Sequence, residues 1–182
     1  MLHINVPKGE YYDDDKQEFI QVKAQALTME HSLISISKWE AIWKKPFLDE
    51  KPKTIEEILS YYQCMTITPN VDPVIYQVLS QANIEKINDY IKDNRSATTF
   101  YQNSHQPGGK KETLTSELIY FYMAANSIPS DYEKWHLSRL IALLRICSIK
   151  NNPKQKKMSK NAVRRQNQSL NAARRAKYNT NG

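Results

Sequence analysis

The last 49 residues of this 182-residue chain contain no acidic side chain. Residues 134–182 carry thirteen Lys/Arg, a net charge of +13, whereas residues 1–133 carry thirteen Lys/Arg against nineteen Asp/Glu, a net charge of −6. The large apolar side chains after residue 150 are Met158, Val163, Leu170 and Tyr178. Because so few apolar groups cannot hold a packed helix without a partner, a hydrophobic core must be built from the residues before 150.

The composition of the rest of the chain favours helices. A body of about 150 residues buries roughly two thirds of its unfolded surface, enough for a stable core. The chain has four glycines, so few backbone positions can adopt positive φ, and a many-turned β-sandwich is disfavoured. Cys64 and Cys147 lie in apolar contexts, so we expect buried, reduced thiols.

No targeting or membrane segment is expected. The N-terminus lacks a charged region followed by an apolar run, so it does not resemble a signal peptide. The apolar stretches are far shorter than the ~20 residues that cross a bilayer. These features predict a protein that is made and used inside a cell, with no membrane partner.

Alternating apolar residues predict two strands near the N-terminus, one over residues 2–6 and one over residues 20–24. We expect the two strands to pair as a small antiparallel ribbon whose acidic tip comprises residues 11–16. Residues 1–27 are thereby predicted to form a β ribbon packed on the rest of the chain.

Helical spacing replaces this alternation from Thr28 onward, and a helix is expected to run from there until Pro46 ends it. Thr54 and Glu57 form a capping-box pattern, in which the threonine hydroxyl serves the N3 amide and the glutamate reaches back. This pattern predicts the start of a second helix.

Further signals divide the remainder of the body. Asp72-Pro73 and Asn83 each predict a helix start. Residues 94–112 are polar and form the best candidate for an internal loop, with room for a short strand at 98–101. A further helix is expected over residues 115–126.

A second capping box at residues 130–133 predicts the start of the strongest helix, which Asn-Asn-Pro at 151–153 ends. The expected fold class is therefore mainly α. It comprises a helical body (28–150), a small N-terminal antiparallel β ribbon (1–27) and a basic, partly helical C-terminal arm (151–182).

No residue pattern predicts catalysis, a metal site or a cofactor. The four histidines lack Cys, Asp or Glu partners at metal-ligand spacing. The Gly108-Gly109-Lys110-Lys111 segment lacks both the first glycine and the Ser/Thr of a phosphate-binding loop. Three consecutive aspartates at 13–15 lack the alternating ligands and the glycine turn of a calcium loop. We therefore expect a protein that is not an enzyme.

Three tryptophans and one histidine, all placed on predicted helices, are the candidate partner contacts of the body. Trp39 and Trp43, at i and i+4, form a large apolar stripe that is either core or an anchor for a partner, since tryptophan is enriched at interface hot spots. Trp135 adjoins His136, which is expected to pack or to form hydrogen bonds instead of binding a ligand.

The basic arm is the second candidate contact. A helix that begins at Ser159 would place Lys160, Arg164 and Arg175 on nearly one face, where they could follow phosphates. Three interpretations remain open: a solubilising extension, a contact with an acidic protein, and a contact with nucleic acid. The basic residues assigned to this contact are Lys154, Lys156, Lys157, Lys160, Arg164, Arg165, Arg174, Arg175 and Lys177.

Several stretches of the chain together resemble an uncharacterised family of bacteriophage proteins. They are residues 30–40 (EHSLISISKWE), 43–48 (WKKPFL), 64–68 (CMTIT), 70–73 (NVDP), 115–120 (TSELIY), 128–129 (IP), 134–137 (KWHL), 139–140 (RL), 156–160 (KKMSK) and 171–175 (NAARR). Members of this family resemble tail assembly chaperones of long-tailed phages.

This resemblance implies a non-enzymatic role in the host cytoplasm during phage assembly, alone or as an oligomer. The chain would shield the aggregation-prone tape-measure protein and recruit tail-tube subunits. The alternative is a structural protein of the virion, located in the tail, at the head–tail junction or inside the capsid. Its basic arm would then contact DNA or an acidic neighbouring subunit.

Overall fold

The computed structural model describes residues 1–13, 17–100 and 113–151, together with isolated positions between 161 and 175. The chain divides into two compact units, Met1–Cys147 and Ser148–Gly182. Among the described residues, those of the hydrophobic core belong to the first unit.

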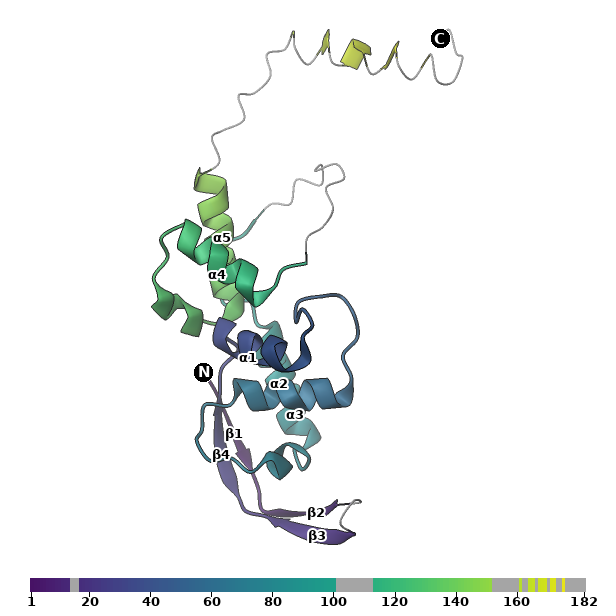
Figure 1. The fold of residues 1–182 in the computed structure, drawn as a ribbon, viewed down its shortest axis with the longest axis vertical. Helices are drawn as coiled ribbons and strands as arrows, with labels where there is room; N and C mark the ends of the chain where they lie inside the picture. Colours follow the sequence, from purple (N-terminus) through teal and green to yellow (C-terminus); the bar gives the residue numbers. More distant parts are fainter. Residues whose placement is uncertain are drawn as a thin grey trace. The chain divides into compact units, whose positions relative to one another are not determined.

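A single bent hairpin forms the N-terminal part of the first unit (Figure 1). Its strands are β1 (Leu2–Val6), β2 (Gly9–Asp13), β3 (Glu18–Val22) and β4 (Gln25–Met29). β1 pairs with β4 and β2 with β3, both antiparallel. Val6 faces Gln25 and Gly9 faces Val22, so both ladders keep one register. The pairing is interrupted at Pro7, which has no N–H to donate.

The hairpin corrects the predicted strand pairing. Residues 2–6 form a strand as predicted, but their partner is 25–29 instead of 20–24. Because residues 9–13 pair with residues 18–22, the latter are not available to β1, which pairs instead with residues farther along the chain. Thr28 is consequently a strand residue and does not start a helix. Of the predicted acidic tip, residues 11–13 belong to β2, and 14–16 lie outside the described residues.

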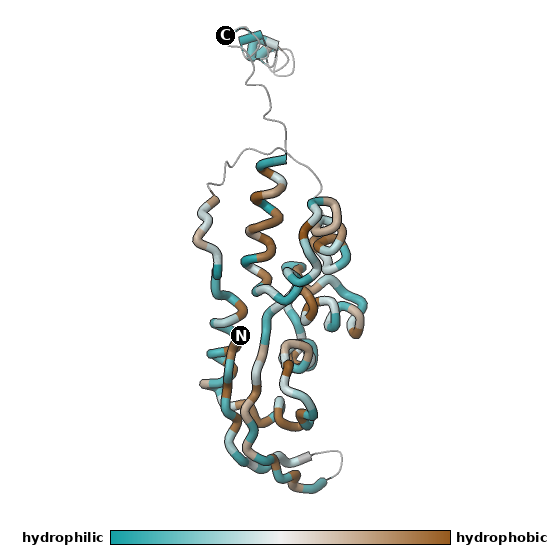
Figure 2. The backbone as a smooth tube through the Cα atoms, turned by 90° about the vertical axis from the view of Figure 1, so that its left-hand side faces the viewer, coloured by the Kyte–Doolittle hydropathy of each residue, from teal (hydrophilic) through white to brown (hydrophobic). Residues whose placement is uncertain are grey.

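The body is helical, so the mainly α fold class with antiparallel N-terminal strands is confirmed (Figure 1). Its α-helices are α1 (Leu33–Trp43), α2 (Ile55–Met65), α3 (Gln81–Lys92), α4 (Ser116–Ala125) and α5 (Leu137–Asn151). Short 3-10 helices, η1 (Pro73–Tyr76) and η2 (Ser130–Lys134), lie between them. Hydrophobic residues recur along α5 and along the paired strands (Figure 2).

Two of three predicted helix starts in the middle of the body are confirmed. The Thr54 capping box opens α2, with the Glu57 amide donating to Thr54 Oγ1 at 3.2 Å. Asp72 caps a helix as predicted, although it is the four-residue η1. The prediction for Asn83 was wrong: its amide donates to Ser80 Oγ at 3.3 Å, so Ser80 is the cap of α3.

The predicted capping box at residues 130–133 was also wrong. Those residues form η2, which has no side-chain cap, and α5 begins only at Leu137. Trp135 and His136 therefore lie on the connection before α5, not on a helix. This connection pairs with the segment before α1: the Leu137 amide donates to the His31 carbonyl at 2.9 Å, and Ser32 and His136 form an antiparallel bridge.

The segment after α3 is irregular, as predicted for a loop. Residues 93–100 form neither helix nor strand, so the described part of the expected strand at 98–101 is not a strand. Residues 101–112, which include the Gly108-Gly109 pair, lie outside the described residues. α4 closely matches the predicted helix at 115–126 and is capped by Thr115.

Hydrogen bonds attach the hairpin to the helices. The Glu30 amide donates to the Met65 carbonyl at 2.8 Å, and the Ile67 amide donates to the Thr28 carbonyl at 2.9 Å. Through these bonds, the end of β4 pairs with residues 65–67 at the end of α2. On the β1 side, Nδ2 of Asn83 in α3 donates to the Asn5 carbonyl at 3.1 Å. The hairpin is thus part of the same packed unit as the helices.

The buried carboxylate of Glu40 joins three segments of the body. Glu40 is 8% exposed and lies in the last turn of α1. It accepts hydrogen bonds from the Phe47 amide and the Ser116 amide, each at 2.8 Å, and from the Ser116 hydroxyl. Because a buried charge is tolerated only where donors satisfy it, this carboxylate fixes the start of α4 against α1.

Replacing this carboxylate should destabilise the body. We expect Glu40→Ala to lower the free energy of unfolding by about 2–4 kcal/mol, because two buried donors of Ser116 and the partly buried Phe47 amide lose their acceptor. Urea denaturation followed by circular dichroism measures this change. Glu85→Gln is the control, since Glu85 is exposed on α3 and should change stability by less than about 0.5 kcal/mol. Equal effects of the two substitutions would contradict the role of Glu40.

Candidate functional site

The two tryptophans of α1 belong to the packed interior. Trp39 is 1% exposed, and its indole Nε1 donates to the Glu57 carbonyl at 2.8 Å. Trp43 is half-buried, and its Nε1 donates to Ser60 Oγ at 3.0 Å. The two rings are stacked with centroids 6.2 Å apart. Both tryptophans therefore attach α1 to α2.

A series of ring contacts, which we call the ring chain, connects these tryptophans to His136. It runs in the order Trp43, Trp39, Phe47, Tyr61, His31, His136 and Tyr90. Neighbouring ring centroids lie 4.0 Å apart at the closest, between Phe47 and Tyr61, and 6.2 Å apart at the most. The structure thus brings Trp39, Trp43 and His136 into one aromatic interior.

The two buried histidines form a polar junction within this interior. His136 Nε2 lies 2.9 Å from the Tyr90 carbonyl oxygen, and since a carbonyl only accepts, this nitrogen carries the proton. His31 Nδ1 is hydrogen-bonded to the Tyr61 hydroxyl. Burial, and secondarily the neighbouring His136, lowers the pKa of His31 to about 4. Burial likewise lowers the pKa of His136. Both rings are consequently neutral at pH 7.

Trp135 does not join this interior. Its half-buried ring is stacked on Tyr132, with centroids 4.2 Å apart and an angle of 13° between the planes. The Arg139 guanidinium lies over the indole, 4.0 Å from the ring centroid. Such a cation–π contact contributes roughly 0.5–1 kcal/mol at an exposed site. The Trp135 ring is therefore in contact with Tyr132 and Arg139 of its own chain.

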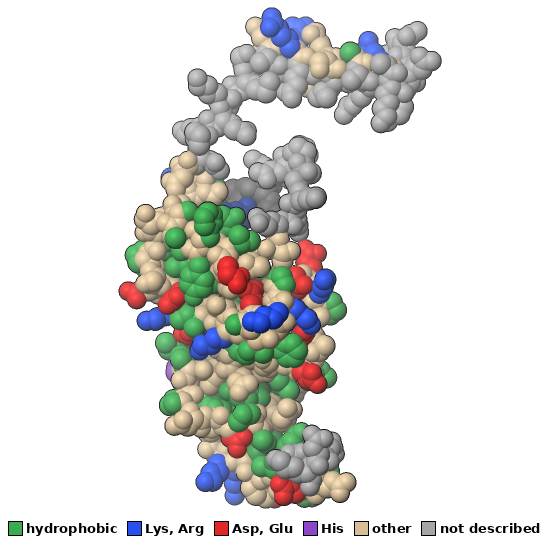
Figure 3. Space-filling model, in the orientation of Figure 1, with side chains coloured by type: hydrophobic (Ala, Val, Ile, Leu, Met, Phe, Trp, Pro, Cys, Tyr) green, Lys and Arg blue, Asp and Glu red, His purple; other side chains and the backbone are tan. Residues whose placement is uncertain are grey.

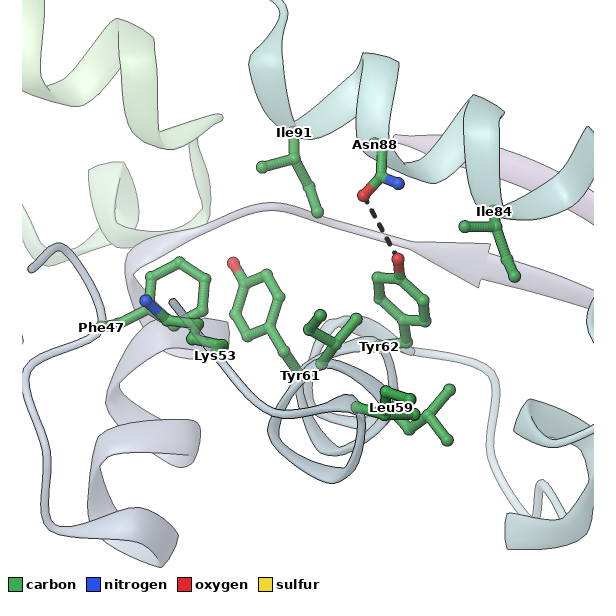
Figure 4. Close-up of a pocket in the computed structure, with 10 residues that line it drawn as sticks. Phe47, Lys53, Leu59, Tyr61, Tyr62, Ile84, Asn88 and Ile91 are labelled. Atoms are coloured by element: carbon green, nitrogen blue, oxygen red, sulfur yellow. Dashed lines mark hydrogen bonds between the residues drawn. The ribbon is translucent and has the colours of Figure 1, made fainter. Parts of the chain in front are cut away.

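An open apolar groove lies between α2 and α3, beside Phe47 and Tyr61 of the ring chain (Figure 4). Its volume is about 330 Å³. The lining residues are Phe47, Lys53, Ile55, Ile58, Leu59, Tyr61, Tyr62, Ile84, Asn88 and Ile91. We call it the α2–α3 groove.

The walls of the α2–α3 groove present apolar side chains to solvent. Ile55 is 77% exposed and Ile58 is 37% exposed, both in the first half of α2. On the facing helix, Ile84, Asn88 and Ile91 have i, i+4, i+7 spacing and point toward the groove (Figure 4). Such a pair of helix faces suits the apolar side of a third helix.

One polar contact crosses the groove. The Tyr62 hydroxyl donates to Asn88 Oδ1 at 3.2 Å, as the dashed line in Figure 4 shows. Tyr62 itself is only 2% exposed. The floor is therefore fixed by packing and by this bond, while the rim remains apolar and accessible.

The sequence analysis did not single out the groove residues as a site. The available signal was the i, i+3, i+4, i+7 spacing of Ile55, Ile58, Leu59 and Tyr62, which places four apolar side chains on one face of α2. The facing of α2 and α3 was not visible in the sequence.

Few of the basic residues assigned to the arm can be placed. Arg164, Arg165 and Arg175 are helical and exposed. Lys154, Lys156, Lys157, Lys160, Arg174 and Lys177 lie outside the described residues.

The described residues lack the features of a metal site and of a membrane span. No group of three or more His, Cys, Asp or Glu side chains among them could hold a metal ion. No helix in this part of the chain is both long and apolar enough to cross a bilayer. Cys64 and Cys147 are free and half-buried, and burial raises the pKa of the Cys64 thiol.

The histidine junction predicts a pH dependence of stability. Because the pKa of folded His31 is about 4 against an ordinary 6.5, the unfolded chain binds more protons between these values. The contribution of His31 is therefore present above pH 6.5 and lost as pH falls toward 4, by at most roughly 3 kcal/mol.

Urea denaturation between pH 4.5 and 7 measures this effect. We expect His31→Gln to flatten the decline of the unfolding free energy on acidification. His3→Gln serves as the control, since His3 is exposed and should leave the decline unchanged. The same slope in all three proteins would refute the assignment.

Comparison with known proteins adds no relative. The chain matches no protein-family model, no curated protein and no solved structure.

Proposed function

We propose that this chain is a non-enzymatic assembly protein whose helical body binds an apolar helical segment of a protein partner in the α2–α3 groove. The observation that carries the proposal is the exposure of Ile55 and Ile58 above a fixed, buried floor. Open apolar surface of this kind is typical of protein interaction sites. A rigid floor also reduces the ordering cost of binding.

The specific role that we propose is a tail assembly factor of a long-tailed bacteriophage. Its support is the resemblance, which includes residues 30–40, 43–48, 64–68 and 70–73. These stretches contain Trp39, whose ring contacts Phe47 of the groove lining. On this proposal the partners are the tape-measure protein and tail-tube subunits. The site of action is the host cytoplasm during assembly.

A basic, partly helical C-terminal arm, residues 151–182, completes the proposal. Its support is the charge of the segment and the helical, exposed positions of Arg164, Arg165 and Arg175. Segments of high charge and low hydrophobicity become ordered when they bind, which keeps such contacts reversible. The arm would add an electrostatic contact to the one made by the groove.

The charge of the arm also favours a second function. A structural virion protein could hold DNA or an acidic neighbouring subunit through the same arm. The observation in favour is the absence of acidic residues after Glu133. The first function needs the groove, whereas the second needs the arm, so separate variants test them.

Co-expression with the tape-measure protein of the encoding phage tests the first function. We expect the chain to increase the soluble fraction of the tape-measure protein, and Ile55→Glu to abolish the increase, because a charge in an apolar groove is costly to desolvate. Ile42→Glu is the matched control, since Ile42 is 62% exposed and outside the groove. An unchanged soluble fraction with the unmodified chain would reject this role.

Titration with duplex DNA at several salt concentrations tests the second function. If the arm neutralises several phosphates, the affinity should fall steeply with salt, and deletion of residues 151–182 should abolish binding. Ile55→Glu should leave DNA affinity unchanged. Binding that is insensitive to salt, or that survives the deletion, would remove DNA as a partner of the arm.

A further inference from the structure

We infer that the partner segment held in the α2–α3 groove is an amphipathic helix with acidic side chains at one end, which lies against a cluster of lysines next to the groove. This inference rests on the proposed function and specifies the chemistry of the partner. It is carried by the position of four lysines in the ten residues that follow α1.

The four lysines line a second hollow of about 320 Å³. They are Lys44, Lys45, Lys51 and Lys53. Two carboxylates, Asp49 and Glu57, line the same hollow, so its lining has two more positive than negative charges. We call it the lysine hollow.

Two of the four lysines have no acidic partner in the described part of the chain. Lys45 Nζ lies 2.6 Å from Glu57 Oε1, and Lys53 Nζ lies 3.6 Å from Asp49 Oδ1. Lys44 and Lys51 are exposed and form no ion pair among the described residues. The free positive charge of the hollow is therefore concentrated on these two side chains.

The lysine hollow adjoins the α2–α3 groove. Lys53 lines both, and Glu57 of the hollow immediately precedes Ile58 of the groove wall. The Lys53 ammonium is held 4.9 Å from the ring centroid of Phe47, at one end of the groove (Figure 4). In Figure 3, Lys and Arg side chains lie directly beside hydrophobic ones over the body. A ligand that fills the groove thus meets positive charge at this end.

The opposite end of the groove has a different character. Ile84 lies there, and the next residue of α3 is the exposed Glu85 (Figure 4). α3 carries two acidic and two basic residues between Glu85 and Lys92, so the net charge of this stretch is zero. The positive end therefore derives from the segment after α1, and it specifies one orientation of a ligand with acidic residues at a single end.

Charge also separates the possible occupants. The C-terminal arm of this chain is basic and would place like charges next to Lys44 and Lys51. A helix with an acidic end neutralises both lysines while its apolar side fills the groove. Apolar contact would supply the affinity, and the charge would supply orientation and a faster association rate.

A random peptide library displayed on mRNA tests the inference with the full chain. Peptides of about 14 residues are selected on the unmodified protein and counter-selected on the Ile55→Glu/Ile58→Glu variant. We expect the enriched peptides to combine helical apolar spacing with Asp or Glu clustered at one end. Circular dichroism confirms that the variant is folded, which its exposed positions favour.

Charge reversal provides the second measurement. Affinity of an enriched peptide, measured by fluorescence anisotropy, should fall by about tenfold or more in Lys44→Glu/Lys51→Glu. Ile42→Glu should change affinity by less than about twofold, since Ile42 lies outside both hollows. The loss in the lysine variant should shrink as salt is raised.

The outcomes separate this inference from the proposed function. Groove-dependent peptides without an acidic end, or an unchanged affinity in the lysine variant, would overturn the inference and leave the groove as a binding site. An absence of groove-dependent peptides would overturn both. Self-association of the unmodified chain that Ile55→Glu abolishes would identify a second copy as the occupant and would likewise overturn the inference.

Discussion

The buried contact between His31 and His136 is the interaction on which the arrangement of the body depends. Their ring centroids lie 5.0 Å apart, and each histidine is bonded to a different helix. His31 is bonded to Tyr61 of α2 through its side chain and receives the Leu137 amide on its carbonyl. His136 is bonded to the last turn of α3 through the Tyr90 carbonyl. Because the imidazoles remain neutral, this junction joins three helices without burying a charge.

The junction also determines how the groove is supported. Tyr61, its partner, packs on Phe47, and both line the α2–α3 groove while forming part of the ring chain. A floor that is hydrogen-bonded and close-packed cannot collapse to hide Ile55 and Ile58. The exposed apolar rim is therefore a stable property of the fold, which is what a preorganised docking surface requires.

Positive charge is concentrated at two places in the chain, the lysine hollow of the body and the C-terminal arm. Residues 1–133 are acidic overall, yet the segment after α1 concentrates lysines beside the groove. The sequence of the C-terminal arm repeats positive charge and contains four large apolar residues. On the functions proposed above, both features would favour acidic partners. Only the groove adds shape and apolar contact, so specificity is expected to reside in the body.

The sequence by itself determined local structure wherever short-range chemistry decides it. Alternation predicted the strand at 2–6, the Thr54 capping box predicted α2, and charge separated the arm from the body. Tertiary contacts decided the rest. The partner of β1 depended on the pairing of residues 9–13 with 18–22, and the start of α5 depended on the bond from Leu137 to His31. The site needed both α2 and α3, because facing helices are brought together by packing, and packing distances are not encoded in the spacing of either helix alone.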